Sequence, residues 1–135
     1  MVIIGVDPHP GIHTAVALDE TGKVLGHLTV QNNEAGLAEL ILWCKSYELR
    51  CCAVEGVNNH FAKTLSERML QESYKVVNIS PSLTSQYRSK RGRKKNDEVD
   101  AENIARFALA NPELVRFTAH KHIEELKTLT RTRGL

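Results

Sequence analysis

The segment VIIGVD, residues 2–7, decides the fold of this chain. It is short, rich in β-branched residues and almost entirely apolar up to its final aspartate, which is the pattern of a strand that is covered on both faces. Pro8 follows and prevents normal continued pairing, so the strand ends there and leaves a carboxylate at its carboxyl end. The segment therefore predicts a central strand with an acid at one edge of a sheet.

The elements predicted around this strand alternate in a recognisable order. Strands are expected at 13–18 and 23–30 around a turn at 19–22, followed by a helix at 34–47, a strand at 51–54, a helix at 60–71, a strand at 74–79 and a helix at 97–110. Three antiparallel strands followed by strands that alternate with helices imply parallel pairing in the second half. By analogy of topology, we predict an α/β fold of the ribonuclease H-like class, with a mixed sheet of about five strands flanked by helices.

Four acids occupy ends of these predicted elements. Asp7 and Glu55 each end a strand, and parallel neighbouring strands would bring both to the edge where open α/β sheets bind ligands. Asp97 and Asp100 are three residues apart in the first turn of the last helix, so they share one face. We expect the four carboxylates to meet.

Carboxylates packed this closely repel one another unless cations are bound between them. A donor set made only of oxygen favours Mg²⁺ or Mn²⁺, and two such ions could support cleavage of a phosphodiester by in-line displacement. Asp7, Glu55, Asp97 and Asp100 are thus the predicted catalytic and metal-binding residues. Each also has a simpler explanation: Asp97 with Asp100 fits a helix N-cap and its partner, Asp7 a turn residue, and Glu55 a solvated strand end.

A basic run leads directly into the last two acids. Residues 88–95 contain six bases and no acid, and the rest of the chain holds 12 bases against 16 acids, a net charge of −4. Runs of this kind are often solvated loops. Its position predicts contacts to nucleic-acid phosphates beside the metals, made by Arg88, Lys90, Arg91, Arg93, Lys94 and Lys95. His9, His13 and His60 are left out of the catalytic set, because an isolated histidine is usually structural.

The length and composition of the chain limit the classes of protein to which it can belong. The chain has 135 residues, which is enough for one domain with its own core. No apolar run is long enough to cross a bilayer and no signal peptide is visible, so a cytoplasmic protein without membrane contact is expected. Cys44, Cys51 and Cys52 show no zinc-ligand spacing and are predicted to be buried, reduced thiols.

Several of these motifs resemble those of the DEDD transposases of the insertion-sequence one-ten type, which include the Piv invertases. The segments IGVDPH (4–9) with HTA (13–15), VEG (54–56) and KNDEVDA (95–101) with IAR (104–106) are similar to that family's motifs. The resemblance implies a RuvC-like domain, an acidic tetrad that binds Mg²⁺ and DNA recombination guided by a structured RNA.

The resemblance also implies a division of the chain. Residues 1–118 are expected to form the catalytic domain, and residues 119–135 are expected to begin a helical, coiled-coil extension towards a second domain. A homo-oligomer is expected, and complete strand exchange by these residues alone is not. Two other functions stay open: a RuvC-type Holliday-junction resolvase, which would cut four-way junctions with the same acids, and a non-catalytic module for nucleic-acid binding or dimerisation. An actin-like nucleotide-binding half ranks last, since Gly11 alone makes a poor phosphate cradle.

Overall fold

The computed structural model describes residues 1–81 and 96–114. In chain order the elements are β1 (Val2–Pro8), β2 (Ile12–Leu18), β3 (Val24–Gln31), α1 (Glu34–Cys44), β4 (Leu49–Glu55), α2 (His60–Gln71), β5 (Val76–Ile79) and α4 (Asp97–Ala110). The predicted order of strands and helices is therefore confirmed over the described ranges.

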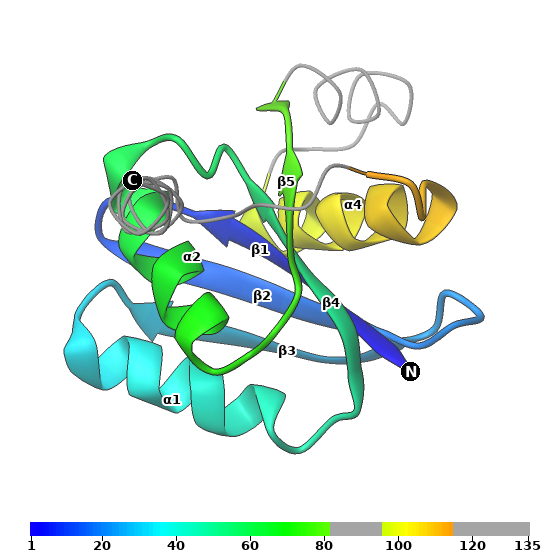
Figure 1. Cartoon of the computed structure of the whole chain (residues 1–135), viewed down its shortest axis with the longest axis horizontal. Coiled ribbons are helices and arrows are strands. Elements are labelled where there is room, and N and C mark those ends of the chain that lie inside the picture. Colours follow the sequence, from blue (N-terminus) through cyan, green and yellow to red (C-terminus); the bar gives the residue numbers. More distant parts are fainter. Residues whose placement is uncertain (82–95, 115–135) are drawn as a thin grey trace, which may run out of the picture.

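Within these ranges the strands form one mixed sheet in the order β3-β2-β1-β4-β5 (Figure 1). β1 and β2 pair antiparallel, as do β2 and β3, whereas β4 runs parallel to β1 and β5 runs parallel to β4. Every residue of β1 is buried. This confirms the predicted ribonuclease H-like sheet, with the first strand at its centre.

Helices cover both faces of the sheet (Figure 1). Ile4 and Val6 of β1 face a core that they share with α1 and α2. Ile3, one residue away, faces a second core under α4, with Ile104 and Ala105. This alternation follows from the period of two along a strand, and it explains why the segment at 2–7 is apolar throughout rather than at every second position.

Three predicted boundaries differ from the observed ones by two or three residues, and the others that differ do so by one residue. The first helix ends at Cys44 instead of Tyr47, because the amides of Ser46 and Tyr47 donate to carbonyls only three residues back. β4 begins at Leu49, where the chain already pairs with β1. β5 begins at Val76 instead of Tyr74, because the Tyr74 amide donates to the Met69 carbonyl at the end of α2.

The three cysteines are buried free thiols, as predicted. Burial raises the pKa of Cys44 to about 12 and also raises the pKa values of Cys51 and Cys52. Because the thiolate is the reactive form, these side chains serve as small core residues.

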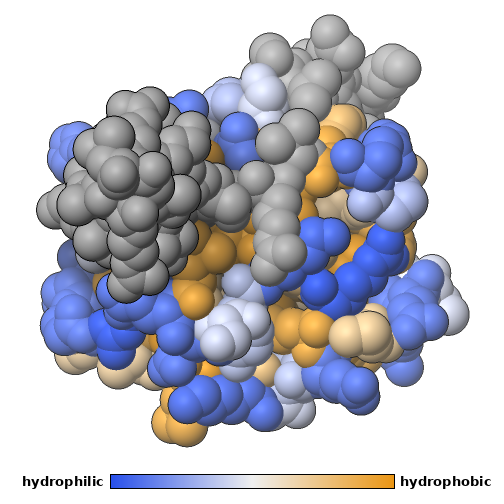
Figure 2. Space-filling view, in the orientation of Figure 1, coloured by the Kyte–Doolittle hydropathy of each residue, from blue (hydrophilic) through white to orange (hydrophobic). Residues whose placement is uncertain are grey.

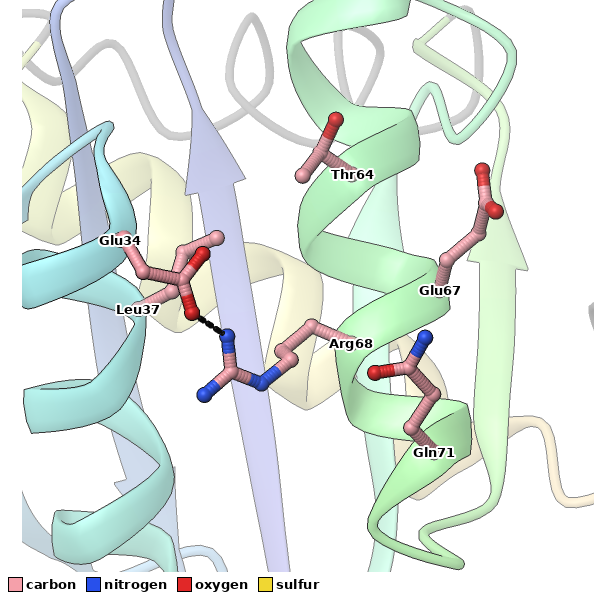
Figure 3. A pocket seen from close by; sticks show the side chains of 6 residues that line it. All are labelled: Glu34, Leu37, Thr64, Glu67, Arg68 and Gln71. Carbon is pink, nitrogen blue, oxygen red and sulfur yellow. Dashed lines mark hydrogen bonds and ion pairs between the residues drawn. The ribbon is translucent and has the colours of Figure 1, made fainter.

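A groove runs between α1 and α2, on the side of the sheet away from α4. Arg68 of α2 forms an ion pair with Glu34 of α1 across it, and Thr64, Glu67 and Gln71 also line it (Figure 3). Exposed pairs of this kind contribute at most about 1 kcal/mol. The two helices are therefore held mainly by their shared apolar core.

The surface around the groove is mixed in character. Polar residues cover much of the view in Figure 2, with smaller apolar areas between them. Among the residues that the structure describes, the large hydrophobic side chains that stay exposed are Met1, Val24, Leu25 and Leu42. Among the helices that the structure describes, none is long and apolar enough to span a membrane.

Candidate metal centre

Asp7 lies at the carboxyl end of β1. Ile3 packs under α4, and residues an even number of positions further along the strand point to the same side of the sheet. Asp7 thus faces the α4 layer, and it is only 5% exposed. A carboxylate is held in a nearly closed space between the sheet and the start of α4.

Glu55 lies beside Asp7 at the same edge of the sheet. Val6 and Val54 are register partners in the parallel β1–β4 pair, so the next residue on each strand is an acid. Ala53 packs under α4, which by alternation places Glu55 on the α4 side as well. The parallel pairing therefore brings together two carboxylates that are distant in the sequence.

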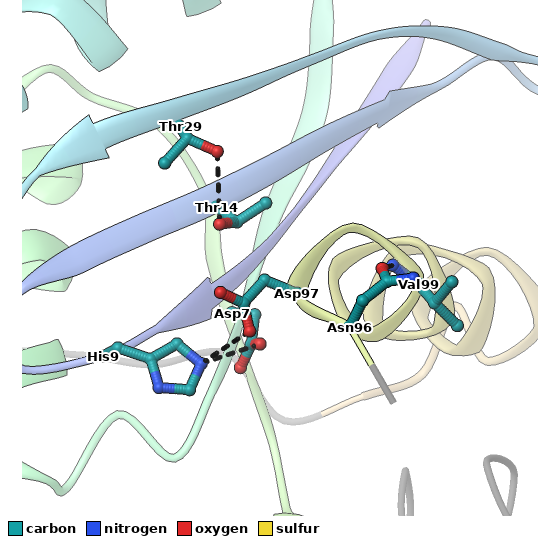
Figure 4. Close-up of polar contacts among 7 residues, drawn as sticks. All are labelled: Asp7, His9, Thr14, Thr29, Asn96, Asp97 and Val99. Atoms are coloured by element: carbon teal, nitrogen blue, oxygen red, sulfur yellow. Dashed lines mark hydrogen bonds and ion pairs between the residues drawn. The ribbon is translucent and has the colours of Figure 1, made fainter. Parts of the chain in front are cut away.

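The first turn of α4 supplies two more acids. Asn96 is the N-cap, and its Oδ1 accepts a hydrogen bond of 2.8 Å from the Val99 amide (Figure 4). The interpretation of Asp97 as the cap is therefore wrong, because the preceding residue already performs that role. Asp97 is left partly exposed, and Asp100 is only 2% exposed.

His9 connects the strand and helix acids. Its Nε2 lies 3.0 Å from Asp7 Oδ2 and 3.4 Å from Asp97 Oδ1 (Figure 4). One ligand atom from each of these three residues lies within 4.8 Å of the other two. The predicted catalytic set does not include His9. Its place two residues after Asp7, in the strand-ending segment Asp-Pro-His, is the one sequence signal for it.

The electrostatics of Asp7 reflect this crowding. Its pKa is raised from 3.8 to about 6, chiefly because burial disfavours the charged form. The hydrogen bond and charge of His9 oppose the rise, whereas the negative charges of Asp100 and Glu55 add to it. All four predicted acids and His9 therefore gather in one region, and a cation placed there would relieve both burial and repulsion.

Asn32 holds the turn that carries His9, a role that the sequence did not suggest. Its amide nitrogen Nδ2 donates to the Pro10 carbonyl at 3.0 Å, and its backbone amide donates to Gly11 at 3.0 Å. His13 Nε2 donates to Asn32 Oδ1 at 2.9 Å from the buried side. Burial lowers the pKa of His13, so its ring is a neutral structural group.

Other polar residues take different places. Thr14, the register partner of Asp7, is buried, and its hydroxyl lies 3.4 Å from that of Thr29 (Figure 4). His60 begins α2 and lines a second pocket between α1 and α2, next to the groove, so it is not part of the acidic cluster. The basic run at 88–95, the boundary at 118/119 and the tail at 119–135 lie outside the described residues.

The sequence matches the model of the DEDD transposase family of the IS110 type, described as a transposase, over residues 4–134. A search of curated proteins found no significant match.

Solved structures with the same fold include resolvases. Thermus thermophilus RuvC in complex with a Holliday junction substrate is 13% identical, with a TM-score of 0.65 over 87% of this chain and 99% of that one. A second structure of Thermus thermophilus RuvC is 15% identical, with a TM-score of 0.65 over 87% and 100% of the two chains. The fowlpox virus Holliday junction resolvase is 12% identical, with a TM-score of 0.56 over 83% and 99%. At these identities the likeness shows a RuvC-like fold alone.

Proposed function

Because this chain belongs to the DEDD transposase family of the IS110 type, we propose that its four clustered acids bind divalent metal for cleavage and transfer of DNA strands. The proposed ligands are Asp7, Glu55, Asp97 and Asp100. One observation supports the proposal: acids from β1, β4 and α4 lie near one edge of the sheet, where burial raises the pKa of Asp7 and the negative charges of Asp100 and Glu55 add to the rise.

The donor set fits a hard divalent ion. Carboxylate oxygens are the ligands that Mg²⁺ and Mn²⁺ prefer. Burying a carboxylate near two other negative charges costs free energy. His9 offsets this cost only in part, so the pKa of Asp7 is still raised to about 6. A bound cation would offset the rest of the cost.

The residues of the cluster have distinct tasks in this proposal. When bound, a divalent ion supplies Lewis-acid stabilisation of the charge that develops on phosphodiester oxygens. Asp7 and Glu55 hold the strand side of the site, while Asp97 and Asp100 close it from the helix. Because the carboxylates stand on a strand edge and on a packed helix, their positions are set by the core rather than by a loop.

We propose two ions, since four carboxylates carry the charge to balance two divalent cations and phosphodiester enzymes commonly use a pair. We also propose that Arg88, Lys90, Arg91, Arg93, Lys94 and Lys95 bind backbone phosphates of the DNA. Support for the second proposal comes from the sequence, in which the run directly precedes α4 and its acid pair.

RNA guidance, homo-oligomer formation and the division into residues 1–118 and 119–135 are further parts of the proposal. They are supported by the family motifs at 4–9, 54–56 and 95–101. RNA that copurifies with the protein and survives a high-salt wash would support guidance. Its loss at low salt would contradict it.

A Holliday-junction resolvase remains the second candidate, on the strength of the shared RuvC-like fold. The family match over nearly the whole chain favours a transposase. Efficient cutting of mobile four-way junctions by the purified chain, without transposon ends, would favour the resolvase instead.

The metal site is tested by calorimetric titration of Mn²⁺ into wild type and an Asp97→Asn/Asp100→Asn variant, with thermal unfolding of each. We expect wild type to bind about two ions per chain and the variant to lose binding while staying folded. Glu98→Gln/Glu102→Gln is the matched control, because it removes two charges from the same helix outside the cluster. Failure of wild type to bind Mn²⁺, alone or with DNA, would contradict the proposal.

A further inference from the structure

His9 is the one nitrogen donor within the acidic cluster that the described residues form. Its Nε2 faces acids on two different elements, 3.0 Å from an oxygen of Asp7 and 3.4 Å from an oxygen of Asp97. Donor atoms that share one ion at about 2.1–2.2 Å and a right angle lie about 3 Å from each other. The separations around His9 therefore match those of ligands to a common ion.

The backbone keeps the imidazole at this place. The His9 amide donates to the Ile12 carbonyl at 3.0 Å, which closes the turn between β1 and β2. Asn32 binds both residues at the centre of that turn, Pro10 and Gly11. The ring itself is 38% exposed, so ions and water reach it from the solvent side.

We propose that His9 Nε2 is a ligand of the divalent ion and that it shifts the preference of the centre from Mg²⁺ towards Mn²⁺. The inference rests on the proposed function, because it concerns the same centre. In the metal-free chain Nε2 is hydrogen-bonded to Asp7. When an ion binds, the neutral imidazole coordinates it through Nε2 with its proton on Nδ1, and any proton on Nε2 is released to solvent.

The selectivity follows from ligand chemistry. Mg²⁺ strongly prefers oxygen and keeps much of its water, so a neutral nitrogen adds little to its binding. Affinity for nitrogen-containing sites increases from Mn²⁺ through the later first-row metals. An all-carboxylate centre would lack this preference.

A purely structural His9 would make the same contacts as an ion-pair partner of the two acids. The experiment must therefore report on a metal–nitrogen bond and not only on affinity. Electron-spin-echo spectroscopy of bound Mn²⁺ does so, because a coordinated imidazole nitrogen modulates the echo.

The test compares wild type with His9→Gln and His27→Gln. Glutamine still donates an N–H group to Asp7, so a structural role would be retained. His27 is a matched control, since it is exposed and lies 3.2 Å from Glu98 of α4, outside the cluster. We expect nitrogen modulation in wild type and in His27→Gln, and none in His9→Gln.

Calorimetry should agree with the spectra. In His9→Gln we expect Mn²⁺ affinity to fall by about tenfold or more and Mg²⁺ affinity to change much less. Mn²⁺ binding without nitrogen modulation in wild type, or modulation that persists in His9→Gln, would overturn the inference while leaving the carboxylate centre in place. Absence of Mn²⁺ binding to wild type, with and without DNA, would overturn both.

Discussion

Gly5 of β1 lies directly against Ala101 of α4. A Cβ atom at residue 5 would come within 2.4 Å of the Ala101 carbonyl oxygen and within 2.6 Å of the Ala105 amide nitrogen. No side chain fits there without displacing helix backbone. The missing side chain allows α4 to approach β1 closely, and this approach brings the acids of the helix next to Asp7.

We expect Gly5→Ala to push α4 away from the sheet. Overpacking of this kind costs about 1–3 kcal/mol, and Mn²⁺ affinity should fall because the acids separate. Chemical denaturation and metal titration measure the two effects. Gly11→Ala is the control for the denaturation measurement, because a Cβ there meets nothing within 4 Å and the backbone does not have a positive φ. Equal stability of the two variants would show that close packing at Gly5 is unimportant.

Asn32→Ala should affect both the fold and the metal centre. It removes the bond to Pro10 and leaves the buried His13 Nε2 without its acceptor, at a cost of about 1–3 kcal/mol. Mn²⁺ should bind more weakly because the turn that carries His9 is released. Asn33→Ala removes the N-cap of α1 and should cost about 1 kcal/mol without changing metal affinity. A metal affinity unchanged in Asn32→Ala would argue against the role of the turn.

The raised pKa of Asp7 predicts how stability depends on pH without metal. Its pKa is about 6 in the folded chain against an ordinary 3.8, so between these values the folded chain binds more protons than the unfolded chain. Lowering the pH from 7 to 4 should therefore stabilise wild type relative to Asp7→Asn. Denaturation of both proteins in a chelator across this range measures the difference, and a constant difference would contradict the raised pKa.

Lowering the pH should weaken Mn²⁺ binding, because the ion competes with the proton for Asp7. Affinity should weaken as the pH falls below about 6.

DNA binding through the basic run should be strongly salt-dependent. Six phosphate contacts predict a log–log slope of about −5 for duplex DNA, and Arg91→Ser/Arg93→Ser should make it less steep by about 2. Lys45→Ser/Lys75→Ser removes the same charge elsewhere and should change the slope little. Equal slopes for the two double variants would place the DNA on another surface. Binding isotherms at several salt concentrations provide the measurement.

The sequence predicted the elements well where the pattern is local. The bounds of α2 and α4 were predicted to the residue, because the apolar spacing that indicates each helix lies within the helix itself. The early end of α1 and the late start of β5 were missed. Both depend on short-range hydrogen bonds at helix ends, for which the residues at 45–47 and 73–75 carry no distinctive signal.

The candidate site, too, was predicted from the sequence only in part. The positions of four acids at element ends, together with parallel pairing, were enough to predict that they meet. The sequence did not show that Asn96 caps α4 instead of Asp97, because both residue types cap helices and only the helix register distinguishes them.

By itself, then, the sequence determined the strand at 2–7, the order of the elements and the acids that they carry to one edge of the sheet. Only the tertiary structure decided that His9 contacts both Asp7 and Asp97, that Asn32 holds the turn of His9 and that α4 packs directly against Gly5. The spacing of apolar residues in the sequence indicates which face of a helix or strand is buried. Apart from the pair of His9 with Asp7, these contacts join residues far apart in the chain, and their distances depend on how closely whole elements pack.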